Sequence, residues 1–411
     1  MFRRNVMLVA SMFLVVLSLG SGVASADPSL RSAFPGANGL IAFASNRSGN
    51  FEIFVMNDDG TGQTKLTNNA ATDTQPAFSP NGTKITFASD RSGDYDIYVM
   101  RADGTNIQRI TSSPGDDTLP TWSPGGSMLA FVSDRAGNDE IYSMDADGSQ
   151  QKRLTKNAAT DTDPTYSPDA RLIAFSSNRT GGDFDVWTMK DNGAQQANLT
   201  DTGDDTRNPT WSPDGTMIAF QSSQDVVNPE IYSMNSDGTG VTRLTFDAFD
   251  DFGPAWSSDG AMITFTSFRL GNRDIYIMNA DGTGVVDLTN NLAGDFYSNW
   301  QALCTIPGTA GNDILGGTPG IDVICGKGGN DDLDGLGGND VIFGGSGDDF
   351  VRGGDGIDTV SGGRGVDVIL GGNQRDFLSG RDGRQGNDVL NGNDGANDCE
   401  ADLLDIRRNC S

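Results

Sequence analysis

Histidine is absent from all 411 residues of this chain. Its absence excludes a Ser-His-Asp triad, a histidine general base and a histidine-ligated metal. The Gly-x-Ser-x-Gly motif that presents a hydrolase serine does not occur either. Long segments of Ala, Leu, Glu and Lys that would form helices are missing, whereas glycine is abundant at 55 residues. The composition therefore excludes histidine-based catalysis and indicates an all-β fold.

Basic residues are scarce, with 28 Lys and Arg against 56 Asp and Glu, a formal net charge of −28 at pH 7. Such a surface repels nucleic acid and anionic lipid, because both are polyanions. We therefore expect no nucleic-acid partner, and we expect cations to be favoured partners.

A long apolar run occurs only near the N-terminus. Arg3 and Arg4 precede an apolar run over residues 6–19, and Ala24-Ser25-Ala26 follows it. This pattern predicts a secretory signal peptide at residues 1–26, cut before Asp27, with a retained signal anchor as the alternative. The run is short for a membrane span and no second run follows, so we expect a mature chain without a span. The expected location is extracellular or on the cell surface.

Cysteine is limited to four residues, all in the last quarter of the chain: Cys304, Cys325, Cys399 and Cys410. An even number of cysteines in an exported protein suggests disulfides, and four allow three connectivities. We favour pairing the first with the second and the third with the fourth, because each pair brackets one end of a repeat described below. Zinc is the competing interpretation, but Cys-x-x-Cys and histidine are both absent.

The middle of the chain repeats one unit every 44 or 45 residues. Its marker is Pro-x-aromatic-Ser, with the aromatic residues at Phe78, Trp122, Tyr166, Trp211 and Trp256 and a degenerate sixth copy at Trp300. Each unit contains four short β-like segments separated by turn residues. Four strands in each unit of this length predict the blades of a β-propeller.

The order of the segments predicts how the ring closes. The first unit begins at its second strand, residues 40–43, so its first strand must come from elsewhere. The unused segment around 296–300, at the far end of the repeats, carries the sixth aromatic residue. We predict that this last strand pairs with the first unit, which removes free sheet edges.

These repeats resemble the PD40, or TolB-like, family of six-bladed propellers, whose pattern is RLT…PxWSPDGxxIAFxSxRxGxxxIYxM. Residues 198–234 keep most of the pattern, although Gln224 replaces the arginine of the turn. The resemblance covers about residues 39–301. It implies the fold but no single activity, because such propellers serve as partner-binding platforms, as gating domains of peptidases and as enzymes.

The loops that enter the first strands carry an aspartate five residues before the aromatic residue. These acids are Asp73, Asp117, Asp161, Asp251 and Asp295, with Asp205 one place off. They could form a ring at one mouth of the channel that attracts a metal ion or a basic segment. The alternative is that each aspartate caps a turn or bonds the backbone of a neighbouring blade. An acidic ring would leave open a calcium-dependent hydrolase resembling propeller phytases.

From residue 308 onward an aspartate recurs every nine residues. The ladder consists of Asp313, Asp322, Asp331, Asp340, Asp349, Asp358, Asp367 and Asp376. An apolar residue follows two places after each, and glycines fill the turns, except that Thr309, Thr318 and Lys327 replace a glycine in early repeats. Residues 308–398 hold 16 Asp, no Glu and six Lys or Arg, a density that repels itself unless neutralised. A hard cation such as Ca²⁺ accepts carboxylate and carbonyl oxygens together.

The ladder resembles the RTX, or hemolysin-type, nonapeptide repeat, in which two nonapeptides make one turn of a parallel β-roll that binds calcium between turns. The resemblance implies two rows of aspartates, one beginning at Asp313 and Asp331 and the other at Asp322 and Asp340. Backbone of the glycine two residues before each aspartate would assist: Gly311, Gly320, Gly329, Gly338, Gly347, Gly356 and Gly365. The register breaks after Gly380, where Asp388 and Asp398 fall out of step, so no site is assigned there. A disordered Gly/Asp-rich tail is the alternative.

The sequence therefore predicts a propeller at residues 27–303 and a calcium-binding β-roll at 304–411. We expect an exported, non-catalytic protein whose roll folds on calcium and whose propeller binds a protein or cell-surface partner. The alternative is the calcium-dependent hydrolase with its site at the channel mouth.

Overall fold

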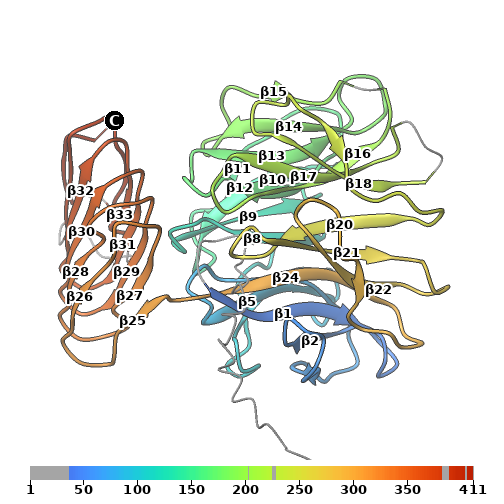
Figure 1. Ribbon diagram of the computed structural model, residues 1–411, viewed down its shortest axis with the longest axis horizontal. Coiled ribbons are helices and arrows are strands. Elements are labelled where there is room, and N and C mark those ends of the chain that lie inside the picture. The colour runs from blue at the N-terminus through green and yellow to red at the C-terminus, as the bar shows by residue number, and fades with distance from the viewer. Residues whose placement is uncertain (1–36, 202, 225–227, 382–387, 403–404, 411) are drawn as a thin grey trace, which may run out of the picture.

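The computed structural model describes residues 37–201, 203–224, 228–381, 388–402 and 405–410. The expected signal peptide, residues 1–26, lies outside these ranges. The described residues form 36 strands in two bodies, a propeller and a roll (Figure 1), and the predicted all-β fold is confirmed. No helix among them is long and apolar enough to cross a membrane.

Six four-stranded antiparallel sheets form the blades of the propeller. Blade 1 contains β24 (Asp295–Leu303), β1 (Ala37–Ser45), β2 (Glu52–Met56) and β3 (Thr64–Lys65). Blade 2 contains β4 (Asp73–Phe78), β5 (Lys84–Ser89), β6 (Asp96–Arg101) and β7 (Gln108–Arg109). Blade 3 contains β8 (Asp117–Trp122), β9 (Met128–Ser133), β10 (Glu140–Asp145) and β11 (Lys152–Arg153).

The remaining blades follow the same order. Blade 4 contains β12 (Asp161–Tyr166), β13 (Leu172–Ser177), β14 (Asp185–Lys190) and β15 (Ala197–Asn198). Blade 5 contains β16 (Thr206–Trp211), β17 (Met217–Ser222), β18 (Glu230–Asn235) and β19 (Thr242–Arg243). Blade 6 contains β20 (Asp251–Trp256), β21 (Met262–Ser267), β22 (Asp274–Asn279) and β23 (Val286–Asp287).

The ring closes through blade 1, as predicted. Strand β24 pairs antiparallel with β1, in a register that includes Ile41 opposite Trp300 and Ser45 opposite Asp295. The first and last strands of the propeller therefore share one sheet, so the ring has no break at this point.

The repeated apolar residues pack between neighbouring blades. In one such cluster, Phe87 and Tyr98 of blade 2 pack with Ala42, Ile53 and Val55 of blade 1, and all five are buried. Side chains alternate along each strand, so one face of every blade meets the blade before it and the other meets the blade after it. Each blade depends on its neighbours for a core.

The C-terminal body is a roll of two six-stranded parallel sheets. One sheet contains β25 (Ile306–Pro307), β27 (Val323–Cys325), β29 (Val341–Ser346), β31 (Thr359–Arg364), β33 (Phe377–Ser379) and β35 (Asp398–Glu400). The other contains β26 (Ile314–Gly316), β28 (Asp332–Asp334), β30 (Phe350–Asp355), β32 (Val368–Asn373), β34 (Val389–Asn393) and β36 (Ile406–Arg408). Between the sheets lies one line of buried residues: Ile324, Leu333, Ile342, Val351, Val360, Ile369, Leu378 and Leu390.

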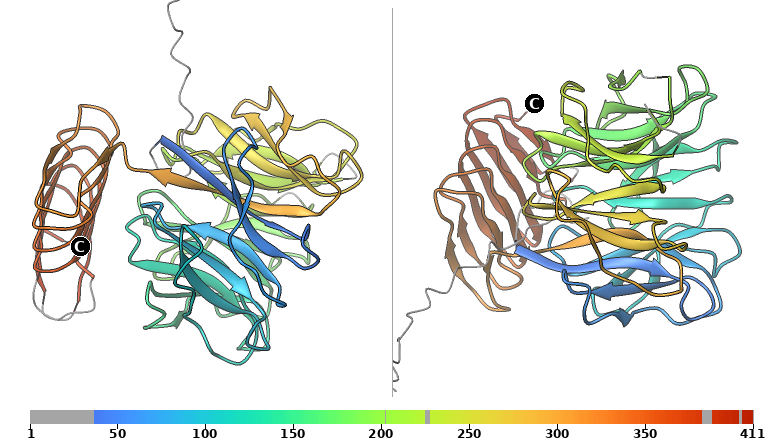
Figure 2. Two further views of the ribbon diagram at one scale, coloured as in Figure 1. Left: turned by 90° about the horizontal axis from the view of Figure 1, so that it is seen from below. Right: turned by 45° about the vertical axis from the view of Figure 1, so that its right-hand side comes forward.

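Disulfides join Cys304 to Cys325 and Cys399 to Cys410, the pairing that the sequence favoured. Only Cys304 and Thr305 separate β24 from β25, so the roll follows the ring-closing strand at once. Figure 2 shows the two layers of the roll standing beside one face of the ring.

Polar contacts join the roll to this face of the ring. The Arg171 guanidinium donates to the Asp398 carboxylate at 3.1 Å, and Arg381 donates to Asp145 at 3.0 Å. The Ser127 hydroxyl donates to Glu400 at 3.2 Å. The contacting propeller residues lie in or beside the turns between first and second strands or between third and fourth strands. We call this end of the ring the roll face and the other end the open face.

Candidate functional site

The aspartates of the nonapeptides form two ladders, one along each side of the roll. Within a ladder, the backbone N–H of each aspartate donates to Oδ1 of the aspartate 18 residues later. In the first ladder Asp331 donates to Asp349 at 2.9 Å, and in the second Asp340 donates to Asp358 at 2.9 Å. The ladders are Asp313, Asp331, Asp349 and Asp367, and Asp322, Asp340, Asp358 and Asp376. This division is the one that the sequence predicted.

In five ladder aspartates the second carboxylate oxygen has no hydrogen-bond donor among the described residues. Oδ2 is buried without a partner in Asp331, Asp340, Asp349, Asp358 and Asp376. A buried acceptor left in this way costs free energy, and a buried charge costs more. These atoms therefore call for a cation or a proton.

Backbone carbonyls converge on the same places. A Cβ atom added to Gly344 would overlap both Oδ2 of Asp349 and the carbonyl oxygen of Gly362. Equivalent overlaps occur at Gly326, Gly335, Gly353 and Gly371. Each turn thus brings a carboxylate oxygen and a carbonyl oxygen to a space that no side chain can occupy. Oxygen ligands of this mixed kind suit Ca²⁺.

Burial makes the charged form of these carboxyls unfavourable. Burial, together with a smaller effect of neighbouring aspartates, raises the pKa of Asp340 to about 8 and that of Asp358 to about 7. The pKa values of Asp349 and Asp376 are raised to about 6 by burial. A divalent cation would supply the countercharge that these buried carboxylates otherwise lack.

Beyond the first turn of the roll, the glycines two residues before each aspartate, which the sequence predicted to assist calcium binding through their backbone, lie against the backbone of the preceding turn. A Cβ atom at Gly356 would overlap the carbonyl oxygen of Gly338, and one at Gly365 would overlap that of Gly347. Their φ angles of 141° and 145° lie in a region that side chains rarely adopt. These glycines stack turn on turn, whereas the first glycine of each nonapeptide, such as Gly344, lies beside Oδ2. Sequence spacing alone did not separate the two glycine sets.

Both ladders continue past the break in register. Asp367 donates to Asp388 at 2.8 Å, and Asp376 donates to Asn397 at 2.7 Å. Asp388 in turn donates to Asp405 at 3.3 Å. Asp398, which the sequence suggested as the next acid, is one place beyond the ladder and binds Arg171 instead. The nine-residue step from Asp388 to Asn397 is present in the sequence, but a pattern of aspartates alone does not reveal it, because position 397 holds an amide.

The predicted ring of acids at the channel mouth is not what the carboxylates form. Five of them are buried, and each pairs with the arginine of the turn between the second and third strands of its own blade. The pairs are Asp295 with Arg47, Asp73 with Arg91, Asp117 with Arg135, Asp161 with Arg179 and Asp251 with Arg269, at 2.6 to 2.9 Å. The arginine charge neutralises each acid, so the set does not present free carboxylates to a ligand.

Blade 5 departs from this pattern. Thr206 occupies the aspartate position and bonds Ser222 at 3.0 Å, while Gln224 stands where the other blades have arginine. Asp205, the predicted sixth acid, is half exposed and pairs with Arg207 at 3.3 Å. Both charges of the pair are thus replaced together in this blade.

A small cavity of about 160 Å³ is lined by equivalent residues of all six blades, as expected for the central channel. The lining includes, from each blade, the residue two places after the position of the arginine-paired aspartate. These six residues are Gln75, Leu119, Asp163, Asn208, Gly253 and Tyr297. Only one of these six residues, Asp163, carries a carboxylate, so the lining is mostly uncharged.

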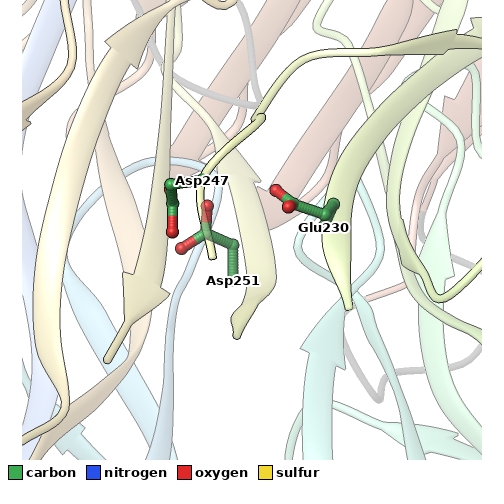
Figure 3. Close-up of side chains that lie close together, drawn as sticks. All are labelled: Glu230, Asp247 and Asp251. Atoms are coloured by element: carbon green, nitrogen blue, oxygen red, sulfur yellow. The ribbon is translucent and has the colours of Figure 1, made fainter. Parts of the chain in front are cut away.

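One group of acids lies between blades 5 and 6. Carboxylate oxygens of Glu230, Asp247 and Asp251 lie within 4.8 Å of one another (Figure 3). Arg243 binds Glu230 at 2.6 Å, and Arg269 binds both aspartates at 2.6 Å. The two guanidinium groups therefore already neutralise most of the negative charge of the three carboxylates, which a metal ion would need for binding.

Comparison with protein families gives two matches. The TolB β-propeller domain (PD40) matches residues 25–119, 111–227 and 201–303. The RTX calcium-binding nonapeptide repeat, in a model of four copies, matches residues 307–342, 326–360, 343–378 and 382–403. No curated protein gives a significant match.

Solved structures similar to the chain include two TolB proteins. TolB from Acinetobacter baumannii is 25% identical, with a TM-score of 0.59 over 64% of this chain and 67% of that one. Putative TolB from Agrobacterium tumefaciens is 20% identical, with a TM-score of 0.51 over 67% of this chain and 92% of that one, and shows the fold alone. The chain thus belongs to the TolB β-propeller (PD40) family and carries a C-terminal array of RTX calcium-binding nonapeptide repeats.

Proposed function

We propose that this chain is an exported, non-catalytic protein whose β-roll binds calcium through its interior aspartates and whose propeller binds a partner. The observation that carries the calcium proposal is the set of buried Oδ2 atoms that face backbone carbonyls without a donor. The oxygen ligands would come from Asp331, Asp340, Asp349, Asp358 and Asp376, together with carbonyls such as that of Gly362. Calcium supplies the positive charge that holds these acceptors together.

Calcium titration of the full chain tests this proposal. Far-UV circular dichroism and isothermal titration calorimetry should detect calcium binding and a gain of β-structure, because binding is coupled to ordering of the roll. Sites of extracellular type have Kd of roughly 10⁻⁴ to 10⁻³ M, so the titration should span this range. Identical spectra in calcium and in chelator, with no binding heat, would falsify the proposal.

Export would match calcium sites of this expected affinity, because a Kd of roughly 10⁻⁴ to 10⁻³ M leaves a site empty at cytosolic calcium and fills it outside the cell. Two disulfides in a chain of this size also suit an oxidising compartment. Fractionation of cells that produce the full chain, with N-terminal sequencing of the exported form, tests export and cleavage before Asp27. A cytosolic, uncut chain would contradict it.

The open face of the propeller supports the partner proposal. Phe246, Leu270 and Leu292 lie in loops at this face, between or within blades 5, 6 and 1, and are 73%, 62% and 100% exposed. Phe246 comes directly after Leu244 and Thr245, which follow the fourth strand of blade 5. At the equivalent position the other blades have polar residues: Asn68, Ser112, Lys156, Asp201 and Asn290. Exposed apolar residues gathered at one rim are typical of protein-binding surfaces.

The triple variant Phe246→Ser, Leu270→Ser, Leu292→Ser tests this surface. A crosslinked partner from the outer surface of the source cells should be lost, because the apolar contact area is removed. The matched control Asn68→Ser, Lys156→Ser and Asp201→Ser changes equivalent polar residues in loops that hold none of the three apolar residues, and it should keep the partner. Retention of the partner by the first variant would place the contact elsewhere.

A calcium-dependent hydrolase at the channel mouth has less support. The acids that would bind its metal are held by arginines. Phosphatase and phytase assays of the wild-type chain and of Asp117→Asn, Asp161→Asn, Asp251→Asn decide the matter. Turnover that the three changes abolish would replace the non-catalytic proposal.

A further inference from the structure

We propose that the first turn of both ladders and the last turn of the second ladder are closed by side-chain hydrogen bonds in place of calcium, so that calcium binds at the ladder aspartates between them. The inference rests on the proposed calcium function and specifies which aspartates take part. The residues that carry it are Thr309 and Thr318 at the first turn and Asn397 at the last.

At the first turn, threonine supplies the donors that interior turns lack. The backbone N–H of Thr309 donates to Oδ2 of Asp313 at 2.6 Å, and its hydroxyl donates to the same atom at 3.0 Å. Thr318 does the same for Asp322, at 2.6 and 2.8 Å. Two donors to one carboxylate oxygen stabilise its charged form without a metal.

The interior turns have no hydroxyl in this place, where Lys327 precedes Asp331 and Leu336 precedes Asp340. The residue equivalent to these threonines is Gly345 before Asp349 and Gly354 before Asp358, with φ of 116° and 114°. A glycine there has no hydroxyl, and Oδ2 of both aspartates has no hydrogen-bond donor. Each Oδ2 of the first turn thus has two donors, the threonine hydroxyl, which glycine lacks, and the threonine backbone N–H, whereas Oδ2 of Asp349 and of Asp358 has neither.

At the last turn of the second ladder, an amide replaces the carboxylate. Asn397 is fully buried and accepts the N–H of Asp376 through Oδ1, as each ladder aspartate does for the one before it. Its Nδ2 lies where the others carry Oδ2, and it donates to the carbonyl oxygen of Gly392 at 2.7 Å. In an interior turn the equivalent carbonyl oxygen, such as that of Gly362, faces Oδ2 of an aspartate, which is another acceptor. Here the carbonyl oxygen of Gly392 receives an N–H group instead. The amide performs the bridging role that calcium would have between two oxygens.

The covalent links lie at the same two ends. Cys304–Cys325 spans the turn that holds Thr309 and Thr318, and Cys399–Cys410 begins two residues after Asn397. The first turn and the Asn397 end of the second ladder are therefore held by hydrogen bonds and disulfides that do not need calcium. Among the described residues, Oδ2 has no such hydrogen bond in Asp331, Asp340, Asp349, Asp358 and Asp376, and these aspartates depend on the metal. We expect calcium to order the roll from two preformed ends toward its middle.

Asn397→Asp tests the last turn in the full chain. The substitution restores a carboxylate at the ladder position and removes the amide donor, so we expect one additional bound calcium per chain by calorimetry and by metal analysis after gel filtration. The matched control is Asn393→Asp, which adds the same charge at an exposed position of the same turn and should leave the number unchanged. Calcium binding by the wild type with no gain in Asn397→Asp would overturn the inference. Wild type that binds no calcium would instead overturn the proposed function on which it rests.

Hydrogen exchange of the wild type, which needs no variant, tests both ends. In chelator, amides in residues 309–325, 397–402 and 405–410 should stay protected, while those in 340–370 should exchange at least tenfold faster than in calcium. The variant Thr309→Val, Thr318→Val keeps the disulfide and loses the hydroxyls, and it should lose protection of residues 309–325 in chelator. Uniform loss of protection along the wild-type roll, or an unchanged first turn in this variant, would contradict the inference.

Discussion

The buried aspartates of this molecule are neutralised in two different ways. In the propeller the five buried aspartates at the starts of first strands each meet an arginine of their own blade, and the guanidinium also lies over aromatic rings, as Arg135 does over Tyr142 at 4.8 Å. In the roll the interior aspartates meet only backbone. The same side chain therefore serves as one half of an ion pair in the first body and as a metal ligand, by our proposal, in the second.

Removal of one partner from a propeller pair should destabilise the ring strongly. We expect Arg135→Gln to lower the free energy of unfolding by about 3 to 5 kcal/mol, because Asp117 would keep a buried charge without a partner. The double variant Asp117→Thr, Arg135→Gln reproduces the residues of blade 5 and should cost less than the single change. Chemical denaturation of the three proteins measures both values. A double variant less stable than Arg135→Gln would show that the pair is not the source of the effect.

Glycine in the roll is required where the backbones of two successive turns touch. Gly356→Ala should destabilise the roll by about 1 to 3 kcal/mol or more, because its φ is 141° and a Cβ atom would overlap the carbonyl of Gly338. Gly337→Ala is the matched control, since the nearest atom to its Cβ would be 3.7 Å away. Thermal unfolding in calcium should separate the two, and equal effects would argue against the stacking described for these glycines.

At the scale of the strand and turn, the roll should respond to pH in opposite directions with and without calcium. The folded-state pKa values of Asp340, Asp358, Asp349 and Asp376 are raised to between about 6 and about 8. The calcium-free folded roll therefore binds more protons than the unfolded chain, and its stability is greatest at low pH and falls as pH rises through this range. Calcium requires the deprotonated carboxylates, so its binding strengthens over the same range.

Melting temperatures of the full chain between pH 4.5 and 8.5 check this expectation. The transition of the roll should fall with rising pH in chelator and rise with pH in excess calcium. The transition of the propeller serves as an internal control. A roll that becomes more stable with rising pH in chelator would contradict the burial of uncharged carboxyls.

Most of the elements could be predicted from the sequence because they repeat. The 44 or 45 residue period gave the blades and the closing strand, and the nine-residue period gave both ladders. Contacts made once could not be predicted in this way. The arginine partners of the propeller acids repeat as well, yet they lie 18 residues from Asp73 and Asp117 in sequence, and only the fold brings them together. The continuation through Asn397 was missed because an amide was not considered as a replacement for a carboxylate.

At the scale of the whole molecule, the ion pairs that join the described part of the roll to one face of the ring are partly exposed. The side chains of Arg171, Asp398, Arg381 and Asp145 are each 19% to 32% exposed, and ion pairs of this kind contribute about 1 kcal/mol or less. The two-residue connection and the Cys304–Cys325 disulfide beside it therefore do much to limit the roll's movement. No periodic pattern in the sequence predicted this arrangement.

Cys304→Ala, Cys325→Ala should increase the freedom of the roll without unfolding the ring. We expect a larger radius of gyration by small-angle scattering in calcium, and unchanged unfolding of the propeller. Cys399→Ala, Cys410→Ala removes the distant disulfide and is the control for loss of covalent structure alone. An equal increase in both variants would show that the first disulfide has no special part in holding the two bodies together.

The closure of the ring through β24 also bears on the order of folding. Arg47 and Asp295, which meet in blade 1, are 248 residues apart, whereas strands within the other blades are joined by short turns. Contacts of such long range form slowly, so closure should limit the folding rate of the propeller. Until Leu303 has left the ribosome, β1 remains an open edge that another chain could join. Only two residues later the roll begins, so the last part of the ring and the first part of the roll become available to fold at nearly the same moment.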